Sequence, residues 1–318
     1  MSAPMTTRTE LHRHLDASIR PQTLVDCASQ FGIDVPFSTA DDVRGRFWIT
    51  KQMGSLKEVL DCFKVFQHVL RDEISLERVA REAVEDAHAE GISQVELRYS
   101  PTFTCEYSGL TWQQAHDAFL RGIQSGTAHS GTKAGLICIV SRGFGLDLAE
   151  QTIDFAIANK KTIIGVDLAG LEEGFPCRLY KNMFRRAADA GLPVTIHAGE
   201  ACGPENVWEA IDLLGARRIG HGIRSIQDVE LVKRLARDQI LLETCPTSNF
   251  VTRSIADWND HPLPRFLEAG VPVSISTDDP GIFGITLGEE YERCKNFLGM
   301  SEADLKRVDL YARKHSFI

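Results

Sequence analysis

The sequence of 318 residues predicts an α/β fold, a closed (β/α)8 barrel of the TIM type with extra helices after its first strand. Two observations carry this prediction. Short apolar runs that end in polar residues recur eight times, and segments with apolar residues at three- and four-residue steps lie between them. Strands that alternate with helices imply a parallel sheet, and eight of them suit one closed barrel. We therefore expect residues 1–318 to form a single domain.

The eight predicted strands leave room for a helix after each of them. In chain order they read "TELHRHLD", "SQVELRYS", "AGLICIVS", "TIIGVDLAG", "PVTIHAGE", "RRIGHG", "ILLETCP" and "VPVSISTD". The segments "SLERVAREAVEDAHAEG" and "LAEQTIDFAIANK" show the helical period. The first connection, from Arg20 to about Ser93, is too long for one helix, and we expect "SLKEVLDCFKVFQHVL" to cross near the barrel mouth. An open doubly wound sheet is the alternative, but no GxGxxG or Walker pattern follows any run.

The composition argues against several kinds of partner. The net charge is −9 and no basic stretch stands out, so neither nucleic acid nor an anionic membrane is an expected partner. There is no apolar run of 18 residues, and "MSAPMTTRTE" lacks the hydrophobic region of a signal peptide. The eight cysteines include no CxxC pair, as is usual in a reducing compartment. These observations predict a cytoplasmic protein and leave its oligomeric state open.

Polar residues lie at the ends of several predicted strands, where a barrel of this kind places its active site. Side chains alternate along a strand, so His12 and His14 point to the same side. Aliphatic residues normally fill such positions, and two imidazoles on one face favour metal binding. The candidate site residues are His12, His14 and Asp16 at the first predicted strand, Gly170 at the fourth, His197 and Glu200 at the fifth, His221 at the sixth, and Asp278 and Asp279 at the eighth.

The expected metal centre holds one zinc ion. Zinc takes neutral imidazole nitrogen and carboxylate oxygen, and His12, His14, His197 and Asp278 supply three nitrogens and one oxygen. With water, such a centre would be five-coordinate. Related hydrolases often bridge two metals with a carbamylated lysine at the end of strand 4, but the lysines of this strand lie at its start, which favours a mononuclear site.

A second motif carries less weight. His88 and Glu90 match the H-x-E half of the zinc nucleobase deaminase signature, but the P-C-x-x-C half is absent. Because the pair falls inside a helical pattern, we interpret it as a solvated helix face.

The remaining polar residues suit hydrolytic chemistry on a ring. Zinc lowers the pKa of a bound water towards about 7, and Asp278 can bind the metal and take a proton from that water. His221 can either orient the resulting hydroxide or accept its proton. Glu200, if protonated in a dry pocket, can protonate a ring nitrogen, and Asp279 can hydrogen-bond another. This set suits attack on an aromatic carbon that bears an amino group, with ammonia as the leaving group.

With their neighbours, these residues resemble the adenosine deaminase family, in its bacterial branch, over essentially the whole chain. The resemblance is carried by "ELHRHLDASIRPQTL", "VELRYSP", "DLAGLEEGFP", "HAGEACGPENVWEAI", "RIGHG", "ETCPTSN", "HPL" and "STDDPGIF". It implies a zinc-dependent hydrolase of purine metabolism that converts adenosine and 2′-deoxyadenosine to inosine and 2′-deoxyinosine. It also implies roles for individual residues: His12, His14, His197 and Asp278 bind zinc, Glu200 protonates purine N1, His221 orients the water with help from Asp278, Asp279 contacts N7, the Gly170 N–H contacts N3, and Asp16 and His14 lie near the 5′-hydroxyl.

Two positions depart from the family pattern and leave the substrate open. Ala17 stands where the family usually has glycine, which restricts the backbone. Leu171 stands where the family usually has aspartate, which makes the sugar side more apolar. A 5′-extended nucleoside such as 6-aminodeoxyfutalosine is therefore an alternative substrate. Adenine is less expected, because relatives that act on the free base tend to carry glutamate at the position of Asp16.

A catalytically dead member should lack a metal or acid residue, and none is missing. A phosphate-ester or cyclic-amide hydrolase is disfavoured by the lack of a lysine at the end of strand 4 and by "HAGE".

Overall fold

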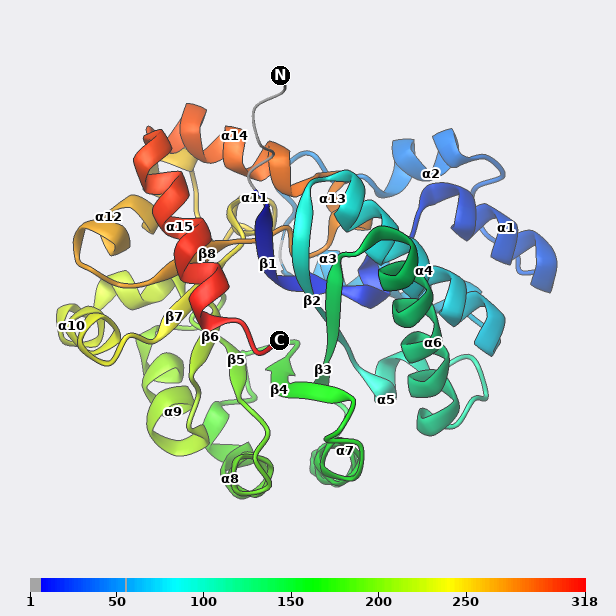
Figure 1. Ribbon diagram of the computed structural model, residues 1–318, viewed down its shortest axis with the longest axis horizontal. Helices are drawn as coiled ribbons and strands as arrows, with labels where there is room; N and C mark the ends of the chain where they lie inside the picture. The colour runs from blue at the N-terminus through cyan, green and yellow to red at the C-terminus, as the bar shows by residue number, and fades with distance from the viewer. Residues whose placement is uncertain (1–6, 55) are drawn as a thin grey trace.

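The computed structural model, which describes residues 7–54 and 56–318, confirms the predicted barrel (Figure 1). Parallel strands form two four-stranded sheets, in the orders β1-β2-β3-β4 and β5-β6-β7-β8. Each strand overlaps one of the predicted runs. The strands are β1 (Arg8–His14), β2 (Ile92–Tyr99), β3 (Lys133–Ser141), β4 (Ile163–Ala169), β5 (Thr195–Ala198), β6 (Arg218–His221), β7 (Leu241–Thr244) and β8 (Val273–Ile275).

Two isolated bridges join the sheets into a closed barrel. Val166 of β4 pairs with Val194 just before β5. At the other seam the backbone N–H of His14 donates to the carbonyl of Asp278 at 2.8 Å, and the N–H of Asp278 donates to the carbonyl of His12 at 3.0 Å. The second seam therefore places the histidines of the first strand beside the aspartate that follows the last strand.

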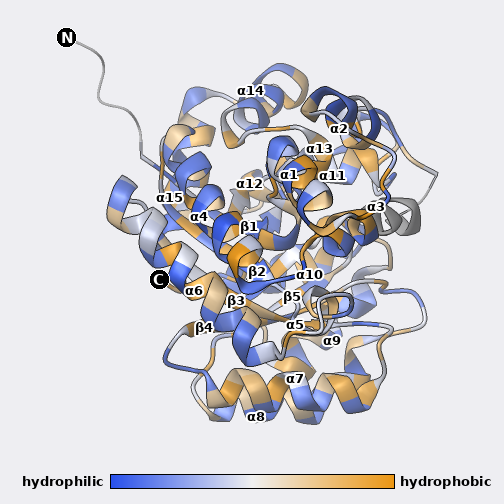
Figure 2. Ribbon diagram, turned by 90° about the vertical axis from the view of Figure 1, so that its right-hand side faces the viewer, coloured by the Kyte–Doolittle hydropathy of each residue, from blue (hydrophilic) through white to orange (hydrophobic). Residues whose placement is uncertain are grey.

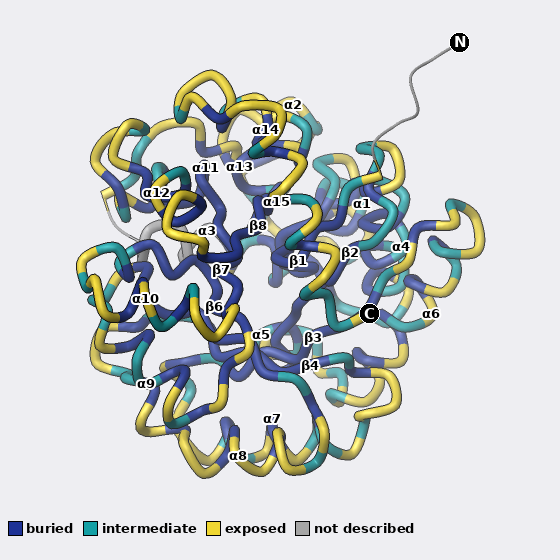
Figure 3. The backbone as a smooth tube through the Cα atoms, turned by 60° about the vertical axis from the view of Figure 1, so that its left-hand side comes forward, coloured by how far each residue is buried: buried dark blue, intermediate teal, exposed yellow. Residues whose placement is uncertain are grey.

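Longer helices surround the barrel, with exposed outer faces and buried inner faces (Figure 3). Their ends follow local signals: α6 begins at a capping box of Thr111 and Gln114 and ends at Gly131, which has a left-handed backbone. In Figure 2, α7 and α8 carry hydrophobic and hydrophilic residues in alternation, as expected for amphipathic helices. The surrounding helices after β2 are α6 (Trp112–Ser130), α7 (Leu146–Ala158), α8 (Lys181–Asp189), α9 (Pro204–Leu214), α10 (Val229–Asp238), α12 (Leu263–Glu268), α14 (Leu287–Leu298) and α15 (Glu302–His315).

Short helices shape the loops around the barrel. They are η1 (Leu15–Ala17), α5 (Pro101–Thr104), η2 (Cys177–Tyr180), η3 (Ile223–Gln227), α11 (Pro246–Val251), η4 (Trp258–Asp260) and α13 (Pro280–Phe283).

The long first connection contains more than one helix, as its length predicts: α1 (Pro21–Phe31), α2 (Ala40–Phe47), α3 (Leu56–Val69) and α4 (Glu73–Ala89). The segment before α3 is bound to the barrel loops, because the N–H groups of Ile49 and Met53 donate to the carbonyls of Ile282 and Val251, both at 2.8 Å. Phe63 of α3 lines the cavity at the mouth, so the expected crossing near the mouth is observed. Ser55, the first residue of the predicted stretch, lies outside the described residues.

The end of the chain packs against the opposite end of the barrel. The Arg218 guanidinium lies 3.5 Å from the centre of the Phe317 ring, and a side chain at Gly165 would collide with that ring. Among the described residues, no helix has the length and apolarity needed to span a membrane. The first six residues of "MSAPMTTRTE", on which the signal-peptide argument partly rests, lie outside the described residues.

The structure corrects one part of the interpretation of the H-x-E motif. His88 is exposed in the last turn of α4, as expected of a solvated helix face. Glu90 is only partly exposed, and its carboxylate pairs with the Arg13 guanidinium at 3.1 Å and accepts the Leu287 N–H at 2.7 Å. Glu90 therefore joins α4 to β1 and α14, a role that depends on tertiary contacts.

Candidate active site

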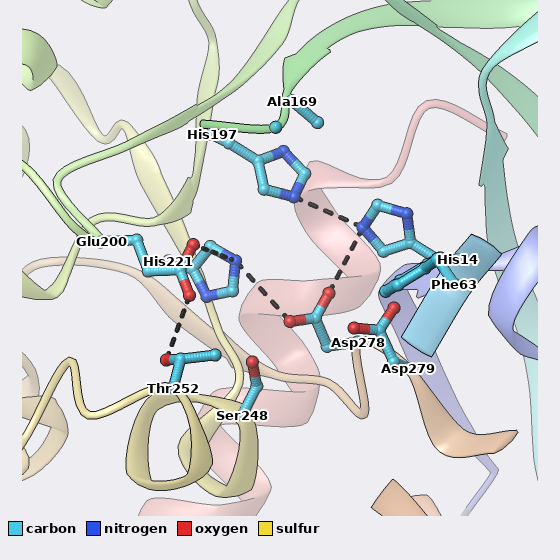
Figure 4. A pocket seen from close by; sticks show the side chains of 11 residues that line it. His14, Phe63, Ala169, His197, Glu200, His221, Ser248, Thr252, Asp278 and Asp279 are labelled. Carbon is cyan, nitrogen blue, oxygen red and sulfur yellow. Dashed lines mark hydrogen bonds and ion pairs between the residues drawn. The ribbon is translucent and has the colours of Figure 1, made fainter. Parts of the chain in front are cut away.

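Four side chains predicted to bind metal meet at one end of the barrel, and we call them the His3Asp group: His12 and His14 of β1, His197 of β5, and Asp278 after β8. All are buried, and one potential ligand atom of each lies within 4.8 Å of the others. Asp278 Oδ1 lies 3.1 Å from His12 Nε2. The same oxygen lies 3.3 Å from His14 Nε2, and the Nε2 atoms of His14 and His197 are 3.4 Å apart (Figure 4). The imidazoles therefore present Nε2 to a common point.

The protonation of this group fits a divalent metal. Burial lowers the pKa of His12, and it lowers the pKa of His197 to about 3, so both rings are neutral and offer a lone pair. Burial alone would raise the pKa of Asp278, but His12 and His221 hold it well below its usual range, so it is a carboxylate. The buried His12 Nε2 has no hydrogen-bond partner, which is costly unless another group occupies that position. Three imidazoles and one carboxylate form a donor set that zinc accepts.

Buried charges behind the group orient its imidazoles. Glu243 Oε2 lies 2.8 Å from His12 Nδ1, and Asp167 Oδ2 lies 2.9 Å from His197 Nδ1. The Arg98 guanidinium joins both carboxylates, each at 2.8 Å. Burial alone would raise the pKa of both carboxyls, but Arg98 and the imidazoles keep those pKa values below their usual range. Each carboxylate therefore takes the Nδ1–H of its imidazole and leaves Nε2 free for a ligand.

The analysis of the sequence missed these three residues. Each is a charged residue inside an apolar run, in "VELRYS", "GVDLAG" and "LLETCP". A filled barrel has few positions for buried charges, so their place in the strands was a usable signal.

Glu200 and His221 lie beside the His3Asp group. His221 Nε2 is 3.6 Å from Glu200 Oε2 and 3.7 Å from Asp278 Oδ2. Burial raises the pKa of Glu200 and favours its protonated form, and the Thr252 hydroxyl donates to Glu200 Oε1 at 3.3 Å. Burial alone would lower the pKa of His221, whereas the negative charge that Glu200 would carry when ionised, and that of Asp278, raise it. The arrangement can supply a carboxylic acid a short distance from the metal position.

Backbone strain accompanies this geometry. His221 and Asp278 adopt left-handed conformations with φ of 59° and 64°, which are uncommon for residues other than glycine. Gly220 of the "GHG" motif lies against the rings, because a Cβ there would approach His12 Cε1 to 3.0 Å. The motif therefore supplies both the turn and the space that the imidazoles need.

The loop that carries Glu200 is held by Glu172, a fourth residue that was not predicted from the sequence. The buried Glu172 carboxylate accepts the backbone N–H groups of Gly199, Glu200, Ala201 and Cys202 at 2.7, 3.0, 2.7 and 2.9 Å. Consecutive N–H groups that converge on one carboxylate form a rigid anion-binding turn.

Two adjacent cavities, which share four lining residues, lie at these side chains. The inner one has a volume of about 50 Å³ and is lined by Gly170, Glu200, Asp279 and most of the His3Asp group. The outer one has a volume of about 310 Å³ and shares His14, Phe63, Ala169 and Gly170 with the inner one. It is also lined by Asp16, Leu171, Phe103 and Phe144. Every residue predicted for the site thus lies at one of the two cavities or, for His12, directly behind the inner one.

The carboxyl groups of Asp16 and Asp279, one at each cavity, are protonated more readily than usual. Burial raises the pKa of Asp16 to about 6. Burial and the neighbouring carboxylate of Asp278 raise the pKa of Asp279 well above its usual range. One oxygen atom of Asp16 and one of Asp279 have no hydrogen-bond partner. Both groups are thus available to a ligand.

The two departures from the family pattern have different consequences. Ala17 lies in η1 and is not among the described residues with positive φ, so its methyl group imposes no backbone strain there. Leu171 lines the outer cavity, as expected.

A second set of side chains could also hold an ion, namely His221, Cys245 and Asp278. It shares Asp278 with the His3Asp group. Burial raises the pKa of the Cys245 thiol well above its usual range, and a neutral thiol is a poor ligand. Lys160 and Lys161 are the two lysines of the predicted fourth strand. They lie before the start of β4, away from the site. The geometry therefore favours one metal.

The fold and this site define a class, the metal-dependent hydrolases built on a (β/α)8 barrel. The adenosine deaminase family model matches residues 7–318. The chain is 39% identical over 310 residues to an adenosine deaminase of Aliivibrio fischeri, covering 98% of this chain and 93% of that one. The chain belongs to the adenosine deaminase family, which confirms the resemblance.

Solved structures agree with this placement. An adenine deaminase from Arthrobacter aurescens has a TM-score of 0.92 and 28% identity, covering 99% of this chain and 94% of that one. An amidohydrolase from Burkholderia ambifaria, solved with bound Zn, has a TM-score of 0.91 and 28% identity, covering 99% and 86%.

Proposed function

We propose that this chain, acting as one (β/α)8-barrel domain, catalyses the zinc-dependent hydrolysis of adenosine and 2′-deoxyadenosine to inosine and 2′-deoxyinosine, with release of ammonia. One observation carries the proposal: a buried carboxylic acid, Glu200, and the His3Asp group face the same small cavity. The identity of 39% to an enzyme named adenosine deaminase supports the same reaction.

The His3Asp group would hold the zinc ion, through Nε2 of its three imidazoles and a carboxylate oxygen of Asp278. The bound Zn of the Burkholderia ambifaria amidohydrolase supports this choice of metal. When bound, zinc supplies Lewis-acid activation of a water molecule. Arg98, Glu243 and Asp167 would keep the imidazoles in the tautomer that binds metal.

The protein side chains would move the protons of the reaction. Glu200 in its acid form donates a proton to N1 of the purine, which makes C6 more electrophilic. The Asp278 carboxylate takes one proton from the attacking water and passes it to the departing amino group, and the second proton of that water returns the Glu200 carboxylate to its acid form as the C6 oxygen becomes a carbonyl. Water and the nucleoside thereby become inosine and ammonia with no net change in protons.

The purine ring would be held by groups that match its other nitrogen atoms. N7 is an acceptor, so Asp279 must donate to it, and the raised pKa of Asp279 supports the protonated form that can do so. The backbone N–H of Gly170 donates to N3. These two contacts and the acid at N1 together distinguish a purine from other amines.

The outer cavity would take the sugar, with Asp16 and His14 near the 5′-hydroxyl. An inner cavity of about 50 Å³ that adjoins an outer one of about 310 Å³ suits a base with a sugar better than free adenine. One specific observation favours the second candidate, a 5′-extended nucleoside such as 6-aminodeoxyfutalosine. Leu171, Phe103 and Phe144 line the outer cavity and give it an apolar wall.

A substrate panel tests the proposal. Zinc-loaded protein is given adenosine, 2′-deoxyadenosine, adenine, AMP and 6-aminodeoxyfutalosine, and loss of the 6-amino group is followed by absorbance. We expect adenosine and 2′-deoxyadenosine to react with kcat/KM of about 10⁴ to 10⁸ M⁻¹s⁻¹. Poor turnover of adenosine with good turnover of the 5′-extended nucleoside would establish the second candidate. No turnover of any 6-aminopurine would overturn the proposal.

The partners and location follow the same proposal. A small purine nucleoside is the expected ligand, without nucleic acid or membrane. A cytoplasmic location stays a prediction, and the oligomeric state is open.

A further inference from the structure

A chain of buried hydrogen bonds leads from α12 to the ring of His221. It uses Asn249 of the motif "ETCPTSN" and His261 and Leu263 of the motif "HPL", three residues to which the proposed function gives no role. The backbone N of Leu263 lies 3.2 Å from His261 Nδ1, His261 Nε2 lies 3.2 Å from Asn249 Oδ1, and Asn249 Nδ2 lies 3.1 Å from His221 Nδ1. The side chains of Asn249, His261 and His221 are buried.

The direction of each hydrogen bond follows from its first link. A backbone N–H can only donate, so Nδ1 of His261 must accept and carries no proton. Burial lowers the pKa of His261 to about 3, so this ring is neutral and its single proton lies on Nε2. That N–H donates to the side-chain oxygen of Asn249. The amide nitrogen of Asn249 therefore faces His221 and donates to its Nδ1.

The opposite direction would be costly. If the Asn249 amide were turned over, its NH2 group would face the Nε2–H of His261, and two donors would meet without an acceptor. A buried donor without a partner costs about 1–3 kcal/mol. The chain has no such conflict in the direction described.

We propose that Asn249 and His261 are positioning residues that hold His221 as the tautomer with its proton on Nε2. This nitrogen faces Glu200 Oε2 at 3.6 Å and Asp278 Oδ2 at 3.7 Å. An N–H at that point donates and cannot accept a proton. The catalytic consequence rests on the proposed function: His221 donates a hydrogen bond to the attacking oxygen, and Asp278 takes the proton from the water.

The first test reads the tautomer directly and requires no activity. Nitrogen-15 NMR of the histidine rings in zinc-loaded protein distinguishes a protonated from an unprotonated ring nitrogen, and the His221 signals are assigned by their loss in His221→Gln. We expect Nδ1 unprotonated and Nε2 protonated in the wild type. A protonated Nδ1 in the wild type, as the other tautomer or as imidazolium, would overturn the proposal.

The second test reverses the last link. Asn249→Asp has nearly the same shape but presents an acceptor to Nδ1, so the proton should move to Nδ1. We expect kcat to fall by about 10²- to 10⁴-fold, as for other enzymes whose catalytic histidine is held in the wrong tautomer, with KM and zinc content changed by less than about threefold. The matched control is Asn296→Asp, the same change at an exposed position of α14, which should leave kcat unchanged.

A further variant covers the case in which Asn249→Asp fails to fold. His261→Phe removes the donor that orients Asn249, so His221 should show both tautomers and an intermediate loss of kcat. Full activity of a folded Asn249→Asp protein with an altered tautomer would overturn the catalytic role. A wild type with the expected tautomer but no deaminase activity would instead contradict the proposed function and leave the positioning intact.

Discussion

The Glu172 carboxylate accepts the backbone N–H of Glu200 at 3.0 Å, although Glu172 follows β4 and Glu200 follows β5. The same carboxylate takes the N–H groups of the residues on both sides of Glu200. Glu172 thus fixes Glu200, the proposed proton donor, through the backbone of Glu200. The carboxyl group of Glu200 is not used in this contact and remains free to face the cavity. Leu171, the neighbour of Glu172, lines the outer cavity, so one loop contacts both the sugar region and the acid.

Glu172→Gln should therefore reduce turnover without removing zinc. An amide has a single acceptor oxygen, so at least one of the N–H groups in the loop loses its partner at about 1–3 kcal/mol of unfolding free energy. The loop that carries Glu200 should then shift, and a displacement of the Glu200 carboxyl group by about 1 Å can lower kcat by up to about 10²-fold. Steady-state kinetics, metal analysis and chemical denaturation measure the three effects. Glu173→Gln, the same change at the next, exposed residue, is the control and should match the wild type. Equal kinetics for both variants would show that Glu172 does not position the acid.

Glu200→Gln should keep the zinc ion and lose most of the activity. The amide preserves the size of the side chain but cannot donate an acidic proton, and general acid catalysis contributes about 10²- to 10⁴-fold. The measurement is kcat with adenosine, together with zinc content by elemental analysis. Turnover close to that of the wild type would refute the assignment of Glu200 as the acid.

The neighbours Asp278 and Asp279 should respond differently to alanine. Asp278→Ala removes a proposed ligand. Loss of a residue that only orients a ligand lowers metal affinity by about 10- to 100-fold, so zinc affinity should fall by more than that in Asp278→Ala. Activity should be lost with the metal. Asp279→Ala should keep zinc and lower kcat/KM by about 10- to 100-fold, because one hydrogen bond to the purine is lost. Competition with a chelator measures the affinities. Tight, stoichiometric zinc in Asp278→Ala would show that the fourth ligand is misassigned.

Glu290 should make the stability of the protein depend on pH. Burial raises the pKa of this carboxyl to about 8 from an ordinary value of 4.5, and its Oε2 has no partner. A group with a raised pKa in the folded state stabilises the fold fully below its ordinary pKa, and this contribution is lost as the pH rises through about 8. At about 1.4 kcal/mol per pKa unit, the loss is on the order of a few kcal/mol.

The pH dependence is tested by comparing the wild type with Glu290→Gln. The amide is neutral at every pH, so the Tm of the wild type should fall relative to that of the variant between about pH 5 and pH 8. Glu292→Gln, at an exposed position of the same helix, should behave like the wild type. Parallel curves of Tm against pH for wild type and Glu290→Gln would contradict the raised pKa.

The sequence alone was enough to predict the barrel and the side chains gathered at its mouth. Alternation makes His12 and His14 share a face, and the carboxyl ends of parallel strands share one end of a barrel, so His197 and Asp278 had to lie near them. These rules act on neighbouring residues and on strand order, both of which can be read along the chain.

Only the tertiary structure decided which groups hold these side chains and in what protonation state. Arg98 joins carboxylates from two distant strands, Glu172 holds a loop that begins after another strand, and the tautomer of His221 depends on a backbone N–H of α12. Such relationships depend on atoms that lie about 3 Å apart, because a hydrogen bond weakens steeply with distance and angle. Residue types and spacing along the chain carry no information at that precision, so only the folded chain could reveal them.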